Sequence, residues 1–324
     1  MGKFIGRKIQ AGIAKESVRG TAVAPTFWLD LADVTIEDKQ ENVIDESSIG
    51  VIEDAKDLKI VSKYSEGELS GKVGDKSIGL LMLAALGTVS SANHAGETTV
   101  KDHTYSVNQT AQHQSITVEA KNPNEQLAFS NAVVSSLEIK AEVGKYVEFV
   151  AGIMAKLGTA AANVPSYTAE NNFIAKDMTV KFADTAAGLD AASAVSVKNI
   201  SVKIEKNIEK DDVLGNVAPD DFLNKQFSIT GSIELNYDAT TYKALALAGT
   251  QKALRIDVKD TGVTLGIGTN PEVKIDLPKV KLTEWAKTSA ADDVVKQTLT
   301  FKAFYSLTDA KMVTVVVTNT QVSY

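Results

Sequence analysis

The sequence predicts a mainly β fold, built from two tandem β-sandwich or barrel units that each carry one α-helix. The first observation is KQFSITGSIELNY (Lys225–Tyr237), where apolar and polar residues alternate with the period of two of a half-buried strand. The second is DATTYKALALAG (Asp238–Gly249), which has an apolar helical stripe and ends in glycine. The third is that SEGELSGKVG (Ser65–Gly74) and DKSIGLLMLAALG (Asp75–Gly87) repeat this order. We therefore expect two copies of one β-rich unit.

Both predicted helices carry start and stop signals. Asp75 and Asp238 stand before the two apolar stretches, and we expect their carboxylates to cap the free N–H groups of the first helical turns. Gly87 and Gly249 stand after them and are expected to end the helices, because glycine adopts the left-handed conformation of a helix C-terminus at little cost.

Changes in pattern along the chain divide it into four segments. Residues 1–26 have no stable period and are predicted to form an N-terminal arm. The first unit is predicted over 27–158, an Ala- and Asn-rich linker over 159–172, and the second unit with a C-terminal strand over 173–324. Each unit is expected to run through two strands, an acidic loop, a strand, a helix and three strands.

Two acidic segments interrupt the predicted strands. They are QENVIDESSIGVIEDAKD (Gln40–Asp57) and IEKDDVLGNVAPDDFL (Ile208–Leu223), and both are too long for tight turns. Long loops inside compact domains are uncommon and are usually functional. We therefore expect these two segments to take part in the function of the protein.

Composition excludes several classes of protein. The 324 residues carry a net charge of −7, with 44% hydrophobic and 23% charged residues, which is typical of a folded protein and argues against tight binding of nucleic acid. The absence of cysteine excludes disulfides, thiolate catalysis and cysteine-based zinc sites. The most apolar run, Ile78–Leu86, has about half of the ~20 residues that a membrane span needs. We expect a protein that is made in a cytoplasm and does not bind a membrane.

Enzyme and cofactor motifs are missing. The chain has no GxSxG, GxxxxGK[ST] or HExxH pattern, and GVTLGIG (Gly262–Gly268) lacks the spacing of a dinucleotide loop. His94, His103 and His113 share one polar segment, but no carboxylate spacing supports a metal site, so surface positions are expected. We expect no enzymatic activity, no catalytic residues, no cofactor and no bound metal.

Paired acids and polar strand faces are the remaining polar features. The acid pairs Asp211–Asp212, Asp220–Asp221 and Asp292–Asp293 lack the glycine of a calcium loop and are expected in turns and caps. Polar residues share one face of two predicted strands: Glu66, Glu68 and Ser70 in the first unit, and Thr230, Ser232 and Glu234 in the second. The pattern alone favours a solvated outer face for both sets.

Several segments together resemble a known family. They are GRKIQAGIAKESVRGTAVAPT (Gly6–Thr26), ESSIG (Glu46–Gly50), GELSGKV (Gly67–Val73), FSITGSIELNY (Phe227–Tyr237), QTLTFKAFYSL (Gln297–Leu307) and VTNTQ (Val317–Gln321). In this order they resemble a tail tube protein, the major tail protein of bacteriophages with long, non-contractile tails. The resemblance covers nearly the whole chain and implies two tail-tube-like units.

The resemblance implies a structural virion protein. Such proteins form rings that stack into a tube, the conduit for DNA ejection. Their rings contain six units, so a duplicated chain is expected to form a trimeric ring with pseudo-sixfold symmetry, and a single-unit chain a hexamer. The implied partners are further copies of the chain and the tail tip, tape-measure and tail terminator proteins. Double-stranded DNA is expected to pass without binding. The implied location is the virion tail, preceded by the host cytoplasm.

Two sets of residues receive roles from this resemblance. Glu66, Glu68, Ser232 and Glu234 are expected to face the lumen, because acidic and hydroxyl side chains do not hold a polyanion. Lys72 and Lys296, at neighbouring alternating positions, argue against this assignment. The two acidic segments and the N-terminal arm are expected to bridge successive rings. The residues assigned to inter-ring contacts are Glu41, Asp45, Glu46, Asp211 and Asp212.

A carbohydrate-binding surface or adhesion module with two β-sandwich domains is the alternative function. It predicts a monomer with an exposed aromatic platform. Only 6% of the residues are aromatic, and Trp28 and Trp285 both lie in strand patterns that predict burial. Rings or tubes of the purified protein would favour the first function, and single particles with ligand-dependent melting the second.

Overall fold

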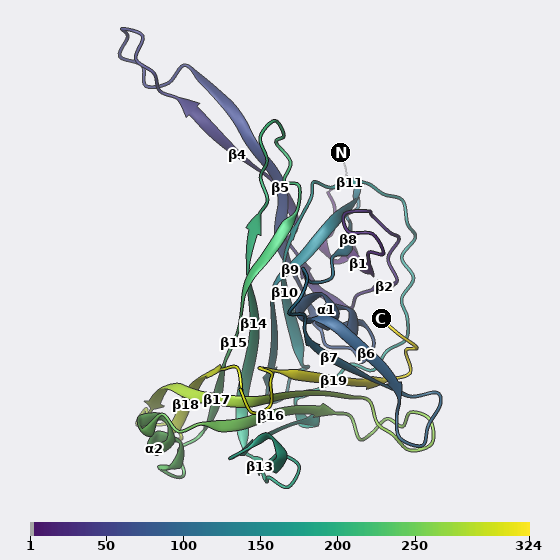
Figure 1. The fold of residues 1–324 in the computed structure, drawn as a ribbon, viewed down its shortest axis with the longest axis vertical. Helices are drawn as coiled ribbons and strands as arrows, with labels where there is room; N and C mark the ends of the chain where they lie inside the picture. The colour runs from purple at the N-terminus through teal and green to yellow at the C-terminus, as the bar shows by residue number, and fades with distance from the viewer. Residues whose placement is uncertain (1–2) are drawn as a thin grey trace.

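Antiparallel strands form most of the chain, which confirms the predicted mainly β class (Figure 1). The computed structural model describes residues 3–324, so Met1 and Gly2 of the predicted N-terminal arm lie outside the described residues. The helices are α1 (Ser77–Leu86) and α2 (Thr241–Ala248), with 3-10 turns at Gly6–Lys8, Ala175–Asp177 and Ala186–Gly188.

One group of strands forms what we call the long sheet, and most of these strands run vertically in Figure 1. In spatial order its strands are β3 (Leu31–Val34) with β4 (Glu37–Asp45), β5 (Asp57–Lys72), β10 (Glu148–Ala155), β9 (Gln126–Glu142), β14 (Val197–Lys210), β15 (Phe222–Asn236), β18 (Lys296–Ala303) and β17 (Glu272–Thr288). Every neighbouring pair is antiparallel, so strands from both halves of the chain share one sheet.

The first part of β17 leaves the long sheet and joins a second group of strands, which lies across it in Figure 1. In this crossing sheet the order is β13 (Ala194–Val195), β12 (Met178–Ala183), β16 (Lys252–Lys259), β17, β19 (Thr314–Asn319), β7 (Lys101–Val107) and β6 (Gly87–Asn93). A third group consists of β2 (Phe27–Trp28), β1 (Gln10–Lys15), β8 (Ile116–Lys121), the first part of β9, and β11 (Thr159–Ala160).

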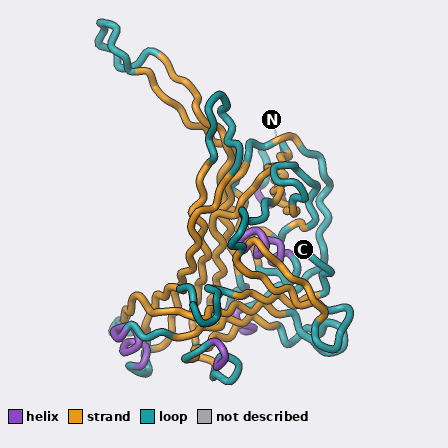
Figure 2. The backbone as a smooth tube through the Cα atoms, viewed as in Figure 1, coloured by secondary structure: helices purple, strands orange, loops and turns teal. Residues whose placement is uncertain are grey.

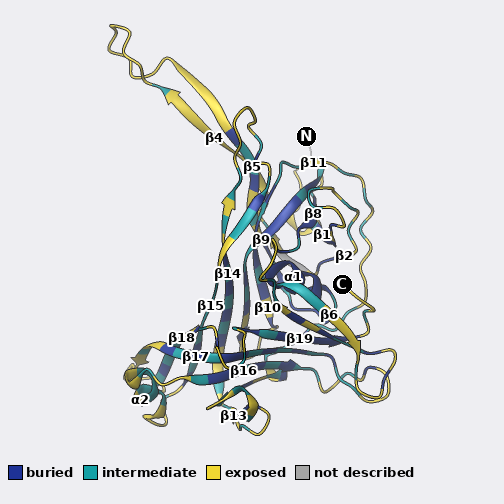
Figure 3. Cartoon of the chain, in the orientation of Figure 1, coloured by how far each residue is buried: buried dark blue, intermediate teal, exposed yellow. Residues whose placement is uncertain are grey.

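The hydrophobic core lies on one face of the long sheet, around α1. Every residue of α1 is buried, which suits a helix that is apolar on all sides. Met82 of α1, Leu137 of β9 and Ile229 of β15 line the same small internal cavity, so the helix and both halves of the sheet meet there. Figure 3 shows this buried centre and the exposed ends of the strands around it.

The helix C-termini agree with the sequence, but the N-termini do not. Gly87 and Gly249 follow α1 and α2 in the left-handed conformation, with φ of 94° and 58°. The prediction that Asp75 and Asp238 cap the helices is wrong, because neither N-terminus has a cap from its own segment. Glu170 lies 93 residues along the chain and accepts hydrogen bonds from the backbone N–H and the hydroxyl of Ser77, at 2.8 and 2.9 Å.

The two predicted acidic loops are shorter than expected, because strands extend into them. β4 continues to Asp45 and pairs with β5 down to Asp57, which leaves only 46–56 as the tip of a long projecting hairpin. β14 and β15 reduce the second loop to 211–221. The predicted N-terminal arm also contains a strand, since β1 pairs with β8 along its whole length.

The segment between β11 and the 3-10 turn at Ala175–Asp177 is a long irregular connection (Figure 2). It covers most of the predicted linker, and its residues Glu170 and Asn171 contact the start of α1. The connection is therefore tied to the first half of the chain.

Pairing follows the same order in both halves of the chain. The first half runs β4–β5–β10–β9 with α1 after β5, and the second runs β14–β15–β18–β17 with α2 after β15. The last strand of each set, β9 or β17, has a bulge where it pairs with the neighbouring strand of its set. Outside the long sheet β9 also pairs with β8, and β17 also pairs with β16.

Candidate assembly surfaces

The face of the long sheet that points away from α1 is polar. One row of directly opposed residues crosses seven strands. Its members are Lys72, Glu148, Lys140, Ser201, Ser232, Thr300 and Glu284. Alternation then directs the apolar neighbours of these residues, such as Leu69 and Ile233, to the core. We call this surface the polar face.

The four residues that the sequence assigns to the lumen all lie on the polar face. Ser232 belongs to the row above, and Glu234 lies two residues further along β15. Glu66 and Glu68 occupy alternate positions of β5, and both are exposed. The structure therefore brings these residues to one surface, although they come from two distant segments of the chain.

The polar face has a mixed charge with an excess of acids. Its acids are Glu37, Glu66, Glu68, Glu138, Glu142, Glu148, Glu205, Glu234 and Glu284, and its lysines are Lys39, Lys72, Lys140, Lys203, Lys281, Lys296 and Lys302. Three of the lysines are paired on the surface itself, Lys39 with Glu37 at 3.1 Å, Lys140 with Glu138 at 3.2 Å and Lys203 with Glu205 at 2.6 Å. These pairs reduce the field that the lysines would present to a passing anion.

The two halves of the chain meet at a strand junction between β9 and β14. The pairing runs from Ser136 opposite Glu205 to Glu142 opposite Asn199. On the core side, Leu137 lies opposite Ile204, and both side chains are buried. The long sheet therefore continues from one half to the other without an exposed edge.

The ends of the long sheet are different, because each leaves a strand edge unpaired among residues 3–324. Residues 283–288 of β17 pair with β18 on one side and with no strand on the other. Residues 33–39 of β3 and β4 pair with β5 on one side only. Unpaired N–H and C=O groups along such edges are templates for pairing with another chain.

The β4–β5 hairpin and loop 211–221 form a second exposed surface. Ile52, at its tip, and Leu214, in loop 211–221, are fully exposed, with 101% and 105% relative accessibility. The hairpin projects well away from the body of the molecule in Figure 1, and Figure 3 shows it as exposed along most of its length. Large apolar side chains on such a projection are typical of a surface that contacts another molecule.

The acids assigned to inter-ring contacts lie on this hairpin and on loop 211–221. Glu41 and Asp212 both approach Lys210, at 2.5 and 3.9 Å, and its ammonium group lies 4.3 Å from the ring centroid of Tyr64. Asp45 forms an ion pair with Lys56 near the tip. Glu46 lies in the exposed tip. The backbone N–H of Asp211 donates to the backbone carbonyl oxygen of Asp221.

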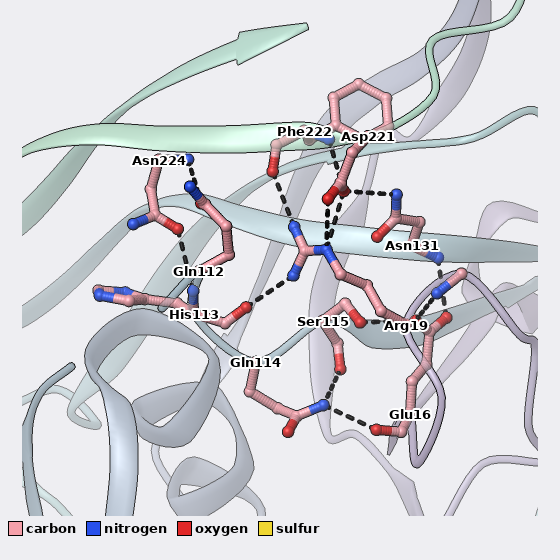
Figure 4. A network of polar contacts seen from close by, with 11 residues as sticks. Glu16, Arg19, Gln112, His113, Gln114, Ser115, Asn131, Asp221, Phe222 and Asn224 are labelled. Carbon is pink, nitrogen blue, oxygen red and sulfur yellow. Dashed lines mark hydrogen bonds and ion pairs between the residues drawn. The ribbon is translucent and has the colours of Figure 1, made fainter. Parts of the chain in front are cut away.

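A polar network fixes the base of loop 211–221 to the N-terminal segment (Figure 4). Arg19 Nε donates to both carboxylate oxygens of Asp221 at 2.8 Å, and its other nitrogens donate to the carbonyl oxygens of His113 and Phe222 at 2.8 Å. Asn131 Nδ2 donates to the same carboxylate at 2.9 Å. Asp221, which the sequence places in a turn, therefore joins distant segments.

Glu16 extends this network into the interior. Its buried carboxylate accepts hydrogen bonds from the hydroxyls of Ser115 and Thr117 and from the backbone N–H groups of Gly20 and Asn131, at 2.7 to 3.0 Å. A buried carboxylate is stable when its oxygens are fully hydrogen-bonded. Neither Glu16 nor Arg19 has a neighbouring sequence signal that reveals this role.

A buried lysine lies beside the network. Lys206 of β14 is buried and donates to the carbonyl oxygen of Ala84, in the last turn of α1, at 2.8 Å. Burial, with the nearby Arg19, lowers the pKa of Lys206 to about 7. The lysine satisfies a helix C-terminal carbonyl that has no partner inside the helix.

The three histidines do not form a common site. His94 pairs with Asp102 at 2.9 Å, whereas His103 and His113 are buried, so the expectation of surface positions is wrong for these two. Burial lowers the pKa of His113 to about 4 and also lowers that of His103. Within residues 3–324, no group of three or more histidines and acids is placed to hold a metal ion.

A long antiparallel sheet with a polar face, two unpaired edges and a projecting hairpin defines a β protein suited to edge-to-edge assembly. A family model described as phage tail tube protein matches residues 6–303. The chain therefore belongs to the phage tail tube protein family, whose members are structural components of the virion tail and assemble into a tube. The comparison with curated proteins gave no match. No described helix has the length and hydrophobicity to cross a bilayer.

Proposed function

We propose that the protein assembles into closed rings of three chains, each chain contributing two duplicated units, and that these rings stack into the tail tube. The observation that carries the proposal is the β9–β14 junction. It joins the last strand of one set, β4–β5–β10–β9, to the first strand of a second set with the same pairing order, β14–β15–β18–β17. A structure that already joins two such sets can join further sets by the same kind of contact.

Ring closure follows from the two unpaired edges. Each chain has one edge of each kind, at β17 and at β3–β4, so chains meet head to tail within the sheet. Three chains supply six units with pseudo-sixfold symmetry, and closing the sheet into a ring removes all its edges. In this proposal the units span 27–158 and 173–324, joined by the linker 159–172, and the arm 1–26 takes part in the contacts between successive rings.

The polar face is proposed to line the lumen, with Glu66, Glu68, Ser232 and Glu234 exposed to the passing DNA. Duplex DNA carries one negative charge per ~1.7 Å of its axis, so a wall with an excess of acids does not hold it. The hydroxyl and glutamate residues of the polar face support this role, and the paired lysines weaken the attraction that lysines would otherwise cause. DNA then passes during ejection without being bound.

Stacking is proposed to use the β4–β5 hairpin and loop 211–221, with Glu41, Asp45, Glu46, Asp211 and Asp212 at the contacts between rings. Support comes from the exposed Ile52 and Leu214 and from the salt bridge that joins the hairpin to Lys210. A head-to-tail contact of this kind does not close and therefore produces a filament.

The remaining parts of the proposal concern partners and location. The tube would end at tail tip and terminator proteins and enclose a tape-measure protein. The chain would be stored in the host cytoplasm until assembly and would have no enzymatic activity. The family assignment supports this role rather than the alternative of a carbohydrate-binding adhesion module.

Electron microscopy and native mass spectrometry of the purified protein test the proposal. We expect rings that contain three chains of 34.5 kDa and show six similar units, together with stacked tubes at high concentration. Rings of six chains would contradict the duplicated unit, and particles that remain monomeric at every concentration would contradict assembly itself.

A variant with a shortened hairpin separates ring formation from stacking. Asp45 and Asp57 are directly opposed, so residues 46–56 can be replaced by an Asn-Gly turn, which suits a two-residue hairpin connection. We expect this variant to form rings but no tubes. Tubes of normal length would exclude the hairpin tip from stacking.

A further inference from the structure

We propose that residues 284–288 of β17 in one subunit pair antiparallel with residues 35–39 of the next subunit, in a register fixed by the β9–β14 junction. In this register Glu284 lies opposite Lys39, Trp285 opposite Asp38, and Ala286 opposite Glu37. The inference rests on the ring of the proposed function, because it requires a second copy of the chain as the partner.

Two glycines show which residues of β3–β4 and of β14 occupy equivalent positions in the two halves of the chain. A Cβ atom at Gly67 would lie 2.4 Å from the carbonyl oxygen of Thr35, and one at Gly231 would lie 2.4 Å from the carbonyl oxygen of Ser201. The same close approach of a neighbouring backbone therefore occurs once in each half. We call two residues counterparts when they occupy the same position in the two halves, so Thr35 is the counterpart of Ser201. Two residues further along each strand, Glu37 is then the counterpart of Lys203. Their partners in the neighbouring strands agree with this, because Glu66 and Thr230 directly precede the two glycines.

Two bulges show which residues of β17 and of β9 occupy equivalent positions in the two halves of the chain. In the first half the pairing of β10 with β9 passes from Ser136 to Val134, and in the second half the pairing of β18 with β17 passes from Glu284 to Leu282. Ile153 of β10 lies opposite Gly67, and Phe301 of β18 lies opposite Gly231, so the two bulges stand at the same distance from the two glycines. Glu284 is therefore the counterpart of Ser136.

The register of the internal junction can now be transferred to the contact between subunits. At the internal junction Ser136 lies opposite Glu205, and Glu138 lies opposite Lys203. Replacing each residue by its counterpart places Glu284 opposite Lys39 and Ala286 opposite Glu37. Both junctions then oppose a lysine and a glutamate on the polar face, Glu138 with Lys203 inside the chain and Glu284 with Lys39 between chains.

The side chains at the two edges are consistent with this pairing. Lys39 and Glu284 are exposed in the single chain, and within the described residues the ion pair of Lys39 is with the exposed Glu37. Trp285 is half-buried at the edge, against Tyr237 and Lys243, with its indole N–H donating to Gln297. A neighbouring strand would cover the remaining exposed part of this ring and remove the edge from water.

The absence of cysteine makes thiol cross-linking a direct test. The variant with Glu37→Cys and Ala286→Cys has the two thiols on directly opposed positions, where Cβ atoms lie about 4.5–5.5 Å apart. Tubes of this variant, treated with an oxidant or a short thiol cross-linker, should yield covalent dimers and trimers on denaturing gels. The control is Glu37→Cys with Ala290→Cys, which lies two residues past the end of β17 and four residues beyond Ala286, about 13 Å for an extended chain, and this variant should remain monomeric.

The yield of rings from variants with exchanged charges is an independent test of the register. Lys39→Glu alone and Glu284→Lys alone should each reduce the yield of rings, and the double exchange should restore it, while thermal melting of the unassembled chain stays unchanged. Tubes that fail to cross-link through 37 and 286, or that cross-link through 37 and 290, would overturn the register and leave the tube intact. An unmodified chain that forms neither rings nor tubes would overturn the proposed function, and the register with it.

Discussion

Arg19 and Asp221 are 202 residues apart in the chain, yet Arg19 Nε lies 2.8 Å from both carboxylate oxygens of Asp221. The contact joins the N-terminal segment to the base of loop 211–221. It is a charge-assisted link between the beginning of the chain and the second half, of a kind about twice as strong as a neutral hydrogen bond. The stability of the loop base should therefore depend on it.

Replacing Arg19 with alanine should lower the free energy of unfolding by about 1–3 kcal/mol. The change leaves the carboxylate of Asp221 and the carbonyl oxygens of His113 and Phe222 without their shared donor. Chemical denaturation measures the loss, and hydrogen exchange should show faster exchange in residues 211–222. Arg7→Ala, at an exposed position, is the matched control and should change neither quantity. Equal behaviour of the two variants would show that the network does not hold the loop.

Gly67→Ala and Gly231→Ala should each destabilise the fold by roughly 1–3 kcal/mol, because the added Cβ would lie 2.4 Å from a backbone oxygen of the neighbouring strand. Thermal and chemical unfolding of the unassembled chain provide the measurement. Gly268→Ala is the control, since no atom lies within 4 Å of the added Cβ there. Two variants as stable as this control would show that the strands can separate at these points without cost.

Lys206 should make stability depend on pH. Its pKa is about 7 in the folded protein and near 10.5 when unfolded, so between these values the unfolded chain binds more protons and stability rises with pH. The penalty of burying a charged lysine is fully present below pH 7 and is relieved toward pH 10.5. One such group contributes a slope of up to ~1.4 kcal/mol per pH unit.

The variant Lys206→Met isolates this contribution. We expect the free energy of unfolding, measured by denaturation from pH 7 to 10, to rise less steeply in the variant than in the unmodified chain. Lys63→Met, on β5 and partly exposed, serves as the control and should keep the original slope. Identical slopes in the chain and in Lys206→Met would mean that Lys206 keeps its charge when buried.

Reversing charges on the polar face should slow DNA ejection. In phage that carry Glu68→Lys and Glu234→Lys, the proposed lumen gains positive charge and attracts the phosphate backbone, and the delay should shrink as salt rises. Ejection rates from purified particles measure the effect. Glu125→Lys, at an exposed position away from the long sheet, is the control. Unchanged ejection at low salt in the double variant would remove the electrostatic role of the polar face.

Local pattern was sufficient for part of this structure. The alternation of residues 225–237 identified the strand β15 and the face that Ser232 and Glu234 share, because a strand directs successive side chains to opposite sides regardless of its partners. Gly87 and Gly249 marked the helix C-termini, since the left-handed conformation is a property of one residue. Trp28 is buried as expected, while Trp285 is only half-buried at a sheet edge.

Other features depend on contacts that a local pattern cannot encode. Asp75 looks like a helix cap in sequence, yet its carboxylate accepts hydrogen bonds from Asn171, and the capping oxygens come from Glu170. His113 looks like a loop residue but is buried between α1 and β15, where its ring Nδ1–H donates to the carbonyl oxygen of Ala85. Each of these outcomes depends on which distant segment reaches the site.

The sequence by itself determined the β class, the alternating faces and the helix ends, because these follow from the geometry of a few consecutive residues. Only the tertiary structure decided that β9 continues into β14, that Arg19 meets Asp221, and which strand edges stay unpaired. Strand partners are chosen by packing and hydrogen bonding between segments far apart in the chain, so neither the junction nor the free edges can be read from any single stretch of residues.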